Sequence, residues 1–117
     1  MSNEAELEEV MRQKGFTVLE LSRHPMVEQM EFFASADIIV APHGAGLTNL
    51  IFSRPGAKVM ELTSDKYVNP CFIDLSQVMG VEHAVHVFPY RGEAGIPNHK
   101  EVWAANLEIV AAEVDKL

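Results

Sequence analysis

The residues best suited to chemistry lie in one short segment, where a histidine and two glycines follow an apolar run. Pro42 ends the apolar run of residues 38–40, His43, Gly44, Gly46 and Thr48 follow it, and apolar residues resume at helical spacing between positions 47 and 52. This order predicts a buried strand, a glycine turn and a helix. The first backbone N–H groups of such a helix have no partner within it, and the positive end of the helix dipole lies behind them, so the turn is suited to bind phosphate. The glycines leave room for an anion, and His43 and Thr48 would flank it with side-chain donors.

The same turn also has a purely structural interpretation, because any α/β domain needs tight connections between strands and helices. Asn49 stands where the dinucleotide-binding fingerprint has its third glycine, and no Gly-Lys-Ser/Thr follows to make a nucleoside-triphosphate loop. The local motif can therefore hold phosphate without identifying the ligand. The absent glycine disfavours a stand-alone dinucleotide-binding or sugar-phosphate-binding protein.

Glu61 is the second residue with chemical potential. It lies near the carboxyl end of a predicted strand over residues 58–62, 17 residues beyond Gly44. Parallel sheets bind ligands beyond the carboxyl ends of their strands, and a carboxylate near this position commonly grips the ribose of a nucleotide. The alternatives are a carboxylate that pairs with Lys58 or caps a loop.

His43 has three possible roles: a general acid or base, a donor to phosphate, or a residue that hydrogen-bonds the turn. Its loop position disfavours a core role, and an imidazole beside a pyrophosphate favours charge stabilisation over base catalysis. His83 and His86 lie three apart on a predicted strand and face opposite sides, so no metal site is expected there. No serine has the context of a nucleophile elbow. Roles at helix starts or on the surface are favoured over ligand contacts for His24, His99, Arg54, Lys58 and Arg91.

Composition indicates one globular domain over residues 1–117, with 48% hydrophobic and 22% charged residues. The net charge of −8 disfavours a nucleic-acid binder and requires that any anion be captured by local N–H groups and a few cations. The single Cys71 excludes an intramolecular disulfide. No apolar run approaches the ~20 residues of a membrane span, and the acidic residues 1–4 do not resemble a secretion signal. These features predict a cytoplasmic protein.

The predicted elements alternate between helices and strands. Helices are expected over residues 4–14, from Pro25 onward, over 47–52, over 70–79 and from about Asn98 onward. In the helix that begins at Pro25, the buried side chains are expected to be Met26, Val27, Met30 and Phe33. Strands are expected over residues 16–21, 38–40, 58–62 and 84–88. Residues 89–98 read as a loop. The alternation predicts a three-layer α/β/α, Rossmann-like domain with a parallel sheet of about four strands. Because a doubly wound domain usually has six, the chain looks like half of a larger unit.

Residues 16–62 resemble the carboxy-terminal part of glycosyltransferase family 61, which includes capsular-polysaccharide transferases, xylan-decorating enzymes and protein O-linked N-acetylglucosamine transferases. The resemblance is carried by residues 28–29, 33–37, 42–50 and 55–62. The run of residues 43–48, His-Gly-Ala-Gly-Leu-Thr, is far more specific than the glycines alone. Looser similarity continues through Tyr67, Phe72, Asp74, Leu75 and Gly80.

The resemblance implies the GT-B architecture, in which a carboxy-terminal Rossmann-like half holds the nucleotide-sugar donor, and it implies inverting transfer without a bound metal or other cofactor. His43, the catalytic residue by this analogy, would bind the donor diphosphate together with Gly44, Ala45, Gly46, Leu47 and Thr48. Glu61 would lie near the nucleoside, and a UDP-sugar is the expected donor. The role of Glu28-Gln29, a motif of the family, stays open between helix packing and a ligand contact.

The chain is short for an enzyme of that family, which needs an amino-terminal half for the acceptor. We therefore expect a fragment that binds the donor and transfers nothing by itself. The alternative is a non-catalytic interaction module. A thin sheet and an apolar last helix would leave apolar surface exposed, and a second copy of the chain would cover it in a homodimer. If the parent protein is eukaryotic, the expected location changes from the cytoplasm to the secretory lumen.

Overall fold

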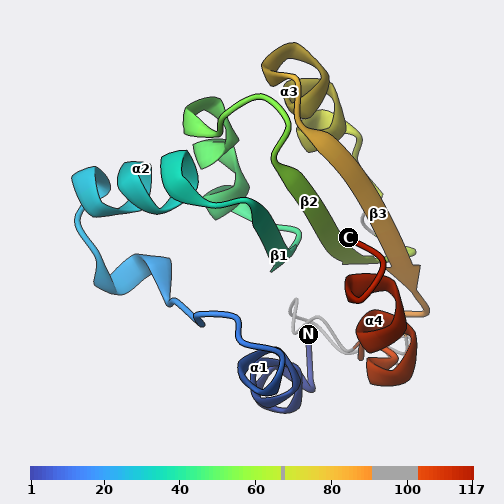
Figure 1. Ribbon diagram of the computed structural model, residues 1–117. Helices are drawn as coiled ribbons and strands as arrows, with labels where there is room; N and C mark the ends of the chain where they lie inside the picture. Colours follow the sequence, from blue (N-terminus) through green and yellow to red (C-terminus); the bar gives the residue numbers. More distant parts are fainter. Residues whose placement is uncertain (67, 91–102) are drawn as a thin grey trace. The chain divides into compact units, whose positions relative to one another are not determined.

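The computed structural model describes residues 1–66, 68–90 and 103–117, and the chain divides into two compact units. The first, called the site unit below, comprises Leu19–Leu62 and Asn69–His86. The second, called the terminal unit, comprises Met1–Val18, Thr63–Val68 and Val87–Leu117. Figure 1 shows the order of the elements along the chain.

Three parallel strands form the sheet, in the order β1 (Ile38–Pro42), β2 (Lys58–Ser64) and β3 (Glu82–Phe88). In the β1–β2 ladder, Ile38 lies opposite Lys58 and Pro42 lies opposite Leu62. Parallel neighbours must be joined by a crossover. The 3₁₀ helix η2 (Ala45–Phe52) supplies the connection from β1 to β2, and α3 (Cys71–Met79) supplies the connection from β2 to β3 (Figure 1).

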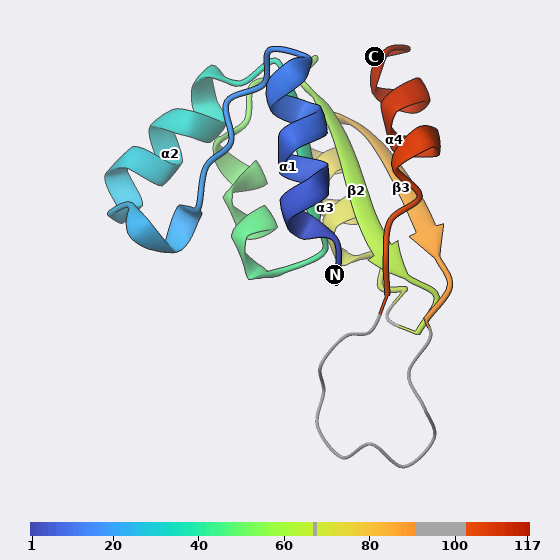
Figure 2. The same cartoon turned by 90° about the horizontal axis from the view of Figure 1, so that it is seen from below.

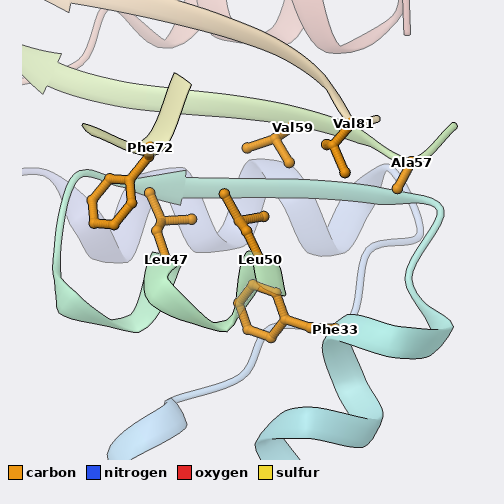
Figure 3. Packing of buried hydrophobic residues seen from close by; sticks show 7 residues of the cluster. All are labelled: Phe33, Leu47, Leu50, Ala57, Val59, Phe72 and Val81. Atoms are coloured by element: carbon orange, nitrogen blue, oxygen red, sulfur yellow. The ribbon is translucent and has the colours of Figure 1, made fainter. Parts of the chain in front are cut away.

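The core of the site unit forms where η2 meets its neighbours. The helix contacts both α2 (Met26–Ser35) and α3 (Figures 1 and 2). Figure 3 shows Leu47 and Leu50 extending from η2 toward the sheet. The buried cluster consists of Phe33, Leu47, Leu50, Ala57, Val59, Phe72 and Val81. Leu50, which is completely buried, anchors η2 and thereby the turn that precedes it.

Turn residues set the ends of α3. Asn69 Oδ1 accepts a hydrogen bond from the Cys71 N–H at 3.0 Å, and Pro70 precedes the first helical residue, as expected at a helix start. Gly80 ends the helix with φ of 71°, a left-handed conformation that residues with a Cβ resist. The chain then enters β3.

The terminal unit is built around α1 (Glu4–Gln13) and α4 (Leu107–Val114), which contact each other and lie side by side in Figure 2. Both polar atoms of the Asn3 side-chain amide bond the backbone of Ala105, at 2.8 and 3.0 Å. Phe88 and Trp103 stack with ring centroids 6.1 Å apart. These contacts join segments from the two ends of the chain.

The prediction of four strands is wrong, since the described residues contain three. Residues 16–21, which are rich in β-forming types, do not form a strand. The Phe16 N–H bonds the Met11 carbonyl of α1, and the 3₁₀ helix η1 (Leu21–Arg23) begins where the predicted strand would end. A strand exists only where a neighbour completes its ladder, and none of the described strands pairs with this segment.

The helices differ from prediction in three places. The helix after the glycine turn is 3₁₀ rather than α. Met26 and Val27 are 59% and 65% exposed, because they lie on the first turn of α2, and only Phe33 of the predicted stripe is fully buried. The last helix begins at Leu107, with Asn106 accepting hydrogen bonds from the N–H groups of residues 108 and 109. The predicted start at Asn98 and much of the predicted loop lie outside the described residues.

None of the helices in the described part of the chain is long and apolar enough to cross a membrane.

Candidate functional site

The carboxyl ends of β1 and β2 bring two of the predicted site residues together. Ala41 pairs with Glu61 in the parallel ladder, and the next step pairs Pro42 with Leu62. The His43 N–H continues this pattern and donates to the Leu62 carbonyl at 2.7 Å. The register thus holds the first residue after β1 beside a residue of β2, and the His43 and Glu61 side chains meet.

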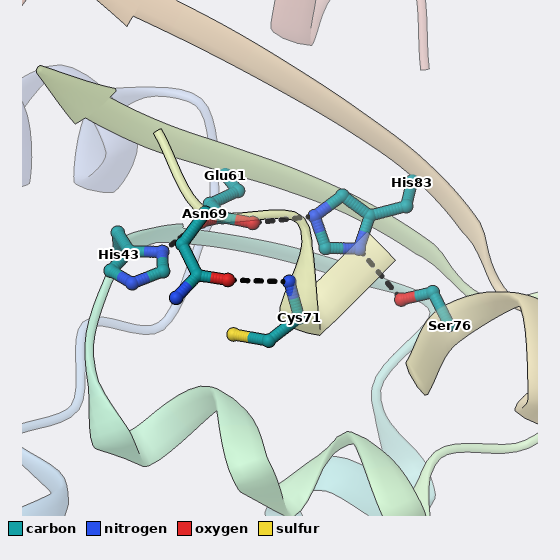
Figure 4. Close-up of polar contacts among 6 residues, drawn as sticks. All are labelled: His43, Glu61, Asn69, Cys71, Ser76 and His83. Carbon is teal, nitrogen blue, oxygen red and sulfur yellow. Dashed lines mark hydrogen bonds and ion pairs between the residues drawn. The ribbon is translucent and has the colours of Figure 1, made fainter. Parts of the chain in front are cut away.

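The Glu61 carboxylate lies between two imidazoles, as Figure 4 shows. Its Oε2 bonds Nδ1 of His43, and its Oε1 bonds Nε2 of His83 at 2.8 Å. The Glu61 side chain is only 1% exposed. A buried carboxylate is costly unless its oxygens are hydrogen-bonded, and here both are.

The hydrogen bonds continue behind Glu61 to a serine. Ser76 Oγ lies 2.6 Å from Nδ1 of His83. The His83 side chain is 2% exposed, and Ser76 is completely buried. His43, Glu61, His83 and Ser76 therefore form a continuous chain of hydrogen bonds, called the His43–Ser76 chain below, with members from the segment after β1, from β2, from β3 and from α3 (Figure 4).

His43 is the accessible end of that chain. Its side chain is 24% exposed, and its ring packs against Phe72 with centroids 5.0 Å apart and planes at 52°. Nδ1 is directed to Glu61, and Nε2 has no hydrogen-bond partner among the described residues. An imidazole fixed at one nitrogen and open at the other can donate to, or accept from, a bound ligand.

The glycine turn adjoins this histidine. Neither the Gly44 nor the Gly46 N–H donates a hydrogen bond to any group in the described part of the chain. Gly46 and Thr48 are exposed, whereas Leu47 is 2% exposed and belongs to the core. The Leu47 side chain is therefore not available to a ligand, and its N–H donates to the Gly44 carbonyl at 3.0 Å. A Cβ on Gly46 would lie 2.9 Å from Cδ1 of Leu21, so glycine permits this close approach.

Gln29 fastens the segment that packs against the turn. Its Nε2 donates to the carbonyls of Leu21 and His24, at 2.8 and 3.0 Å, and its Oε1 accepts from the Asn49 side chain at 3.0 Å. Asn49 is only 7% exposed. Gln29 thus links η1, α2 and η2 through one side chain. Of the two roles left open for the Glu28-Gln29 motif, these bonds give Gln29 the structural one.

Comparison with known proteins identifies the family. Residues 1–60 match the sequence profile of Glycosyltransferase 61, which is more than half of the chain. The chain belongs to glycosyltransferase family 61. The resemblance drawn from residues 16–62 is confirmed. No solved structure matches the chain.

Two family-61 relatives are named beta-1,2-xylosyltransferases. The rice protein (Oryza sativa subsp. japonica) is 36% identical over 63 residues, which are 53% of this chain and 12% of the relative. The Arabidopsis thaliana protein is 31% identical over 74 residues, or 62% of this chain and 14% of the relative. A third relative, the EGF domain-specific O-linked N-acetylglucosamine transferase of Xenopus laevis, is 35% identical over 57 residues, covering 49% of this chain and 11% of the relative. The chain thus spans about one eighth of the length of these proteins.

The family-61 profile covers only part of the site. The matched residues, 1–60, include His43, the glycine turn and Gln29, and they end one position before Glu61. Three of the four members of the His43–Ser76 chain therefore lie beyond the match. Of these three, Glu61 was predicted from the sequence, and His83 and Ser76 are placed in the site by the structure.

Sequence reasoning found His43 and Glu61 but missed His83 and Ser76. His83 is 22 positions from Glu61, and no spacing rule connects them. The signal that could have found the pair is the adjacency of β2 and β3, because a polar residue early in β3 had to be satisfied by its neighbours. Ser76 was missed because the helix over residues 70–79 was predicted from its apolar residues, and a single serine within it gave no signal.

The other residues considered from the sequence lie elsewhere. His24 Nδ1 is 3.3 Å from Glu28 Oε1, and Arg54 pairs with Asp37. No Lys58 side-chain contact with Glu61 is present. Arg91 and His99 lie outside the described residues. Among the residues that the structure describes, no group of three His, Cys, Asp or Glu side chains is placed to hold a metal ion.

Proposed function

We propose that this chain is the donor-binding part of an inverting, metal-independent glycosyltransferase of the GT-B type. The observation that carries the proposal is the position of His43, which Glu61 holds at the carboxyl end of β1 beside the glycine turn. Membership of family 61 supplies the class of reaction, glycosyl transfer. The ligand site expected for a parallel sheet lies beyond the carboxyl ends of its strands, where this histidine lies.

The chemistry of transfer explains why a donor site needs these groups. An acceptor oxygen forms a bond to the anomeric carbon while the bond from that carbon to the diphosphate oxygen breaks. The bonding electrons leave with the diphosphate, so negative charge grows there. Hydrogen-bond donors already aimed at that position stabilise the transition state. The N–H groups of Gly44 and Gly46 and Nε2 of His43, when protonated, are donors of this kind.

The turn contributes mainly through its backbone. Gly44, Ala45 and Gly46 bring N–H groups to the diphosphate, Leu47 anchors the turn in the core, and Thr48 adds an exposed hydroxyl. This division follows from the burial of Leu47 and the exposure of Gly46 and Thr48.

Glu61 has a different set of partners from those indicated by the sequence. Both of its oxygens are engaged by imidazoles and its side chain is 1% exposed. A contact with ribose would require one of these bonds to break. We assign Glu61 the role of orienting His43 and balancing its charge when the imidazole is protonated.

The proposal leaves the acceptor and its base to other parts of a parent enzyme. The isolated chain is expected to bind a UDP-sugar weakly and to transfer nothing. These three relatives come from plants and an animal, which favours the eukaryotic alternative and the secretory lumen over the cytoplasm.

Titration with nucleotides tests the donor site directly. The ¹⁵N-labelled chain is titrated with UDP, GDP and UDP-sugars while amide shifts are followed, with uridine as the control that lacks the diphosphate. We expect shifts at Gly44, Gly46 and Thr48 with UDP but not with uridine. The variant His43→Leu should weaken UDP binding about 10-fold or more, since a hydrogen bond to a charged group contributes ~1.5–3 kcal/mol. Absence of shifts at these residues at millimolar UDP would rule out the proposed function.

Exposed apolar side chains favour a second candidate, a module that self-associates. Val78 is 82% exposed, and Met26 and Val27 on α2 are more than half exposed. Apolar surface of this kind can drive pairing of two copies. Light scattering at several concentrations measures the mass in solution, and a monomer throughout would contradict the homodimer.

A further inference from the structure

The buried end of the His43–Ser76 chain has the composition of a catalytic triad without its accessibility. Ser76, His83 and Glu61 are connected in that order at 2.6 and 2.8 Å. In a hydrolase, such an arrangement activates the serine hydroxyl against a substrate. Ser76, however, is completely buried, and His83 and Glu61 are at most 2% exposed. No substrate reaches this serine, so the bonds of the three residues serve groups inside the protein.

The directions of the hydrogen bonds connect Ser76 and His83, through Glu61, to His43. A carboxylate only accepts hydrogen bonds, so His83 Nε2–H and His43 Nδ1–H both donate to Glu61. In a neutral imidazole one nitrogen donates and the other accepts. With His83 in its neutral form, Nδ1 is therefore the acceptor, and the Ser76 hydroxyl donates to it. The directions of all three bonds therefore follow from the Glu61 carboxylate, which accepts from both imidazoles.

His83 also determines how the carboxylate lies. The terminal torsion of a glutamate is broad and roughly two-fold, so Glu61 by itself does not present one oxygen to His43. The bond from His83 holds Oε1 and leaves Oε2 directed to His43. Without it, Oε1 would be a buried acceptor with no partner, and the carboxylate would gain by turning to find one.

We propose that His83 and Ser76 are positioning residues that, through Glu61, hold His43 with its proton on Nδ1 and Nε2 open to ligand. The Glu61 carboxylate sets the tautomers of both imidazoles, His83 fixes the orientation of Glu61 through Oε1, and the Ser76 hydroxyl holds the ring of His83 through Nδ1. This arrangement of protons is that of the chain without bound ligand. Its consequence for donor binding rests on the proposed function, in which Nε2 faces the diphosphate.

Imidazole ¹⁵N spectra of the whole 117-residue chain test the proposal, because they distinguish a proton on Nδ1 from one on Nε2. They are recorded at a pH where the imidazoles are neutral. We expect wild-type His43 to be the Nδ1–H form, and His83→Leu to give a mixture of both forms. His83→Gln should restore the Nδ1–H form, since its amide N–H can replace Nε2–H of the imidazole. Ser76→Ala should give a partial loss.

Control variants separate positioning from folding. His86→Gln changes another histidine of β3, whose side chain has no hydrogen-bond partner among the described residues, and should leave His43 unchanged. Amide spectra report whether each variant is folded. If His83→Leu does not fold, the comparison of Ser76→Ala with wild type decides the matter, and an unchanged His43 tautomer in Ser76→Ala then contradicts the proposal.

The two proposals fail in different ways. An unaltered Nδ1–H form in folded His83→Leu overturns the positioning role, whether or not UDP binds. Wild-type protein that shows the Nδ1–H form but binds no UDP supports the positioning role and contradicts the donor site. If both hold, His83→Leu should weaken UDP binding about 10-fold and His83→Gln should recover most of it, as expected for one charge-assisted hydrogen bond at ~1.5–3 kcal/mol.

Discussion

Replacing Glu61 with glutamine changes the charge at the centre of the His43–Ser76 chain while keeping its shape. The carboxylate accepts two hydrogen bonds, one on each oxygen. The glutamine amide can accept only on its oxygen, and its NH₂ group needs an imidazole nitrogen that accepts. His83 can provide one by moving its proton to Nδ1 and donating to Ser76 Oγ. The variant should therefore fold, with neutral hydrogen bonds in place of charge-assisted ones.

The cost follows from the number of bonds that lose their charge. A hydrogen bond to a charged group contributes ~1.5–3 kcal/mol and a neutral one ~0.5–1.5 kcal/mol. Over the two bonds of Glu61, the difference is about 2–3 kcal/mol. A domain of this size has a free energy of unfolding of ~5–15 kcal/mol. Glu61→Gln should therefore lower the stability clearly without abolishing the fold.

Glu61→Leu sharpens the comparison. Leucine removes both acceptors and leaves the N–H groups of His43 and His83 facing an apolar side chain, and each buried unpaired donor costs ~1–3 kcal/mol. Replacing one member of a buried charged network is destabilising even where replacing all members is not. The expected order of stability is wild type, then Glu61→Gln, then Glu61→Leu.

Urea denaturation, followed by circular dichroism, measures these differences as changes in midpoint at constant slope. The matched control is Glu82→Gln on β3, since Glu82 is exposed and its side chain has no partner among the described residues. Such a substitution should stay within ~0.5 kcal/mol of wild type. Glu61→Gln as stable as Glu82→Gln, or Glu61→Leu more stable than Glu61→Gln, would refute the reasoning.

Three further substitutions test how the turn is supported. Leu50→Ala should cost ~2–5 kcal/mol in urea denaturation, because the side chain is completely buried beneath η2. Gln29→Leu removes three hydrogen bonds at about 1 kcal/mol each, so a loss near 3 kcal/mol is expected, and a loss below ~0.5 kcal/mol would show that these bonds do not hold η1. Gly46→Ala places a Cβ 2.9 Å from the end of the Leu21 side chain, a contact that should cost about 1 kcal/mol. The cost should vanish when Leu21→Ala is the background, and equal costs in both backgrounds would contradict the contact.

Residues that punctuate the chain made much of the fold predictable. Gly80, with its left-handed φ of 71°, ends α3 as expected, and Asn69 with Pro70 begins it. The apolar runs at residues 38–40, 58–62 and 84–88 all fall within strands. These signals are local, because a cap or a turn involves residues only a few positions apart.

The errors concern elements whose structure depends on distant partners. The segment 16–21 has strand-forming residues, but no strand within residues 1–66, 68–90 and 103–117 completes a ladder with it. The apolar spacing of residues 47–52 does not distinguish a 3₁₀ helix from an α-helix, since both bury every third or fourth residue. In the site, the pairing of strand ends could be predicted, which joined His43 with Glu61. The position of β3 in the sheet could not be predicted, so His83 and Ser76 were not assigned to the site.

The negative net charge of the protein makes a local positive group beside the turn important for binding an anion. An anion must approach against a net charge of −8. The arginines in the described part of the chain are each paired with a carboxylate on the surface. Arg54 follows η2, and the eight residues of that helix, at ~2 Å each, separate it from the turn by roughly 16 Å along the helix axis. His43 is beside the turn, and its positive form is balanced by the carboxylate of Glu61. A protonated His43 therefore presents an N–H to the anion while its own charge is balanced by the buried Glu61 carboxylate, so the site can stabilise a diphosphate with a pair that is neutral overall.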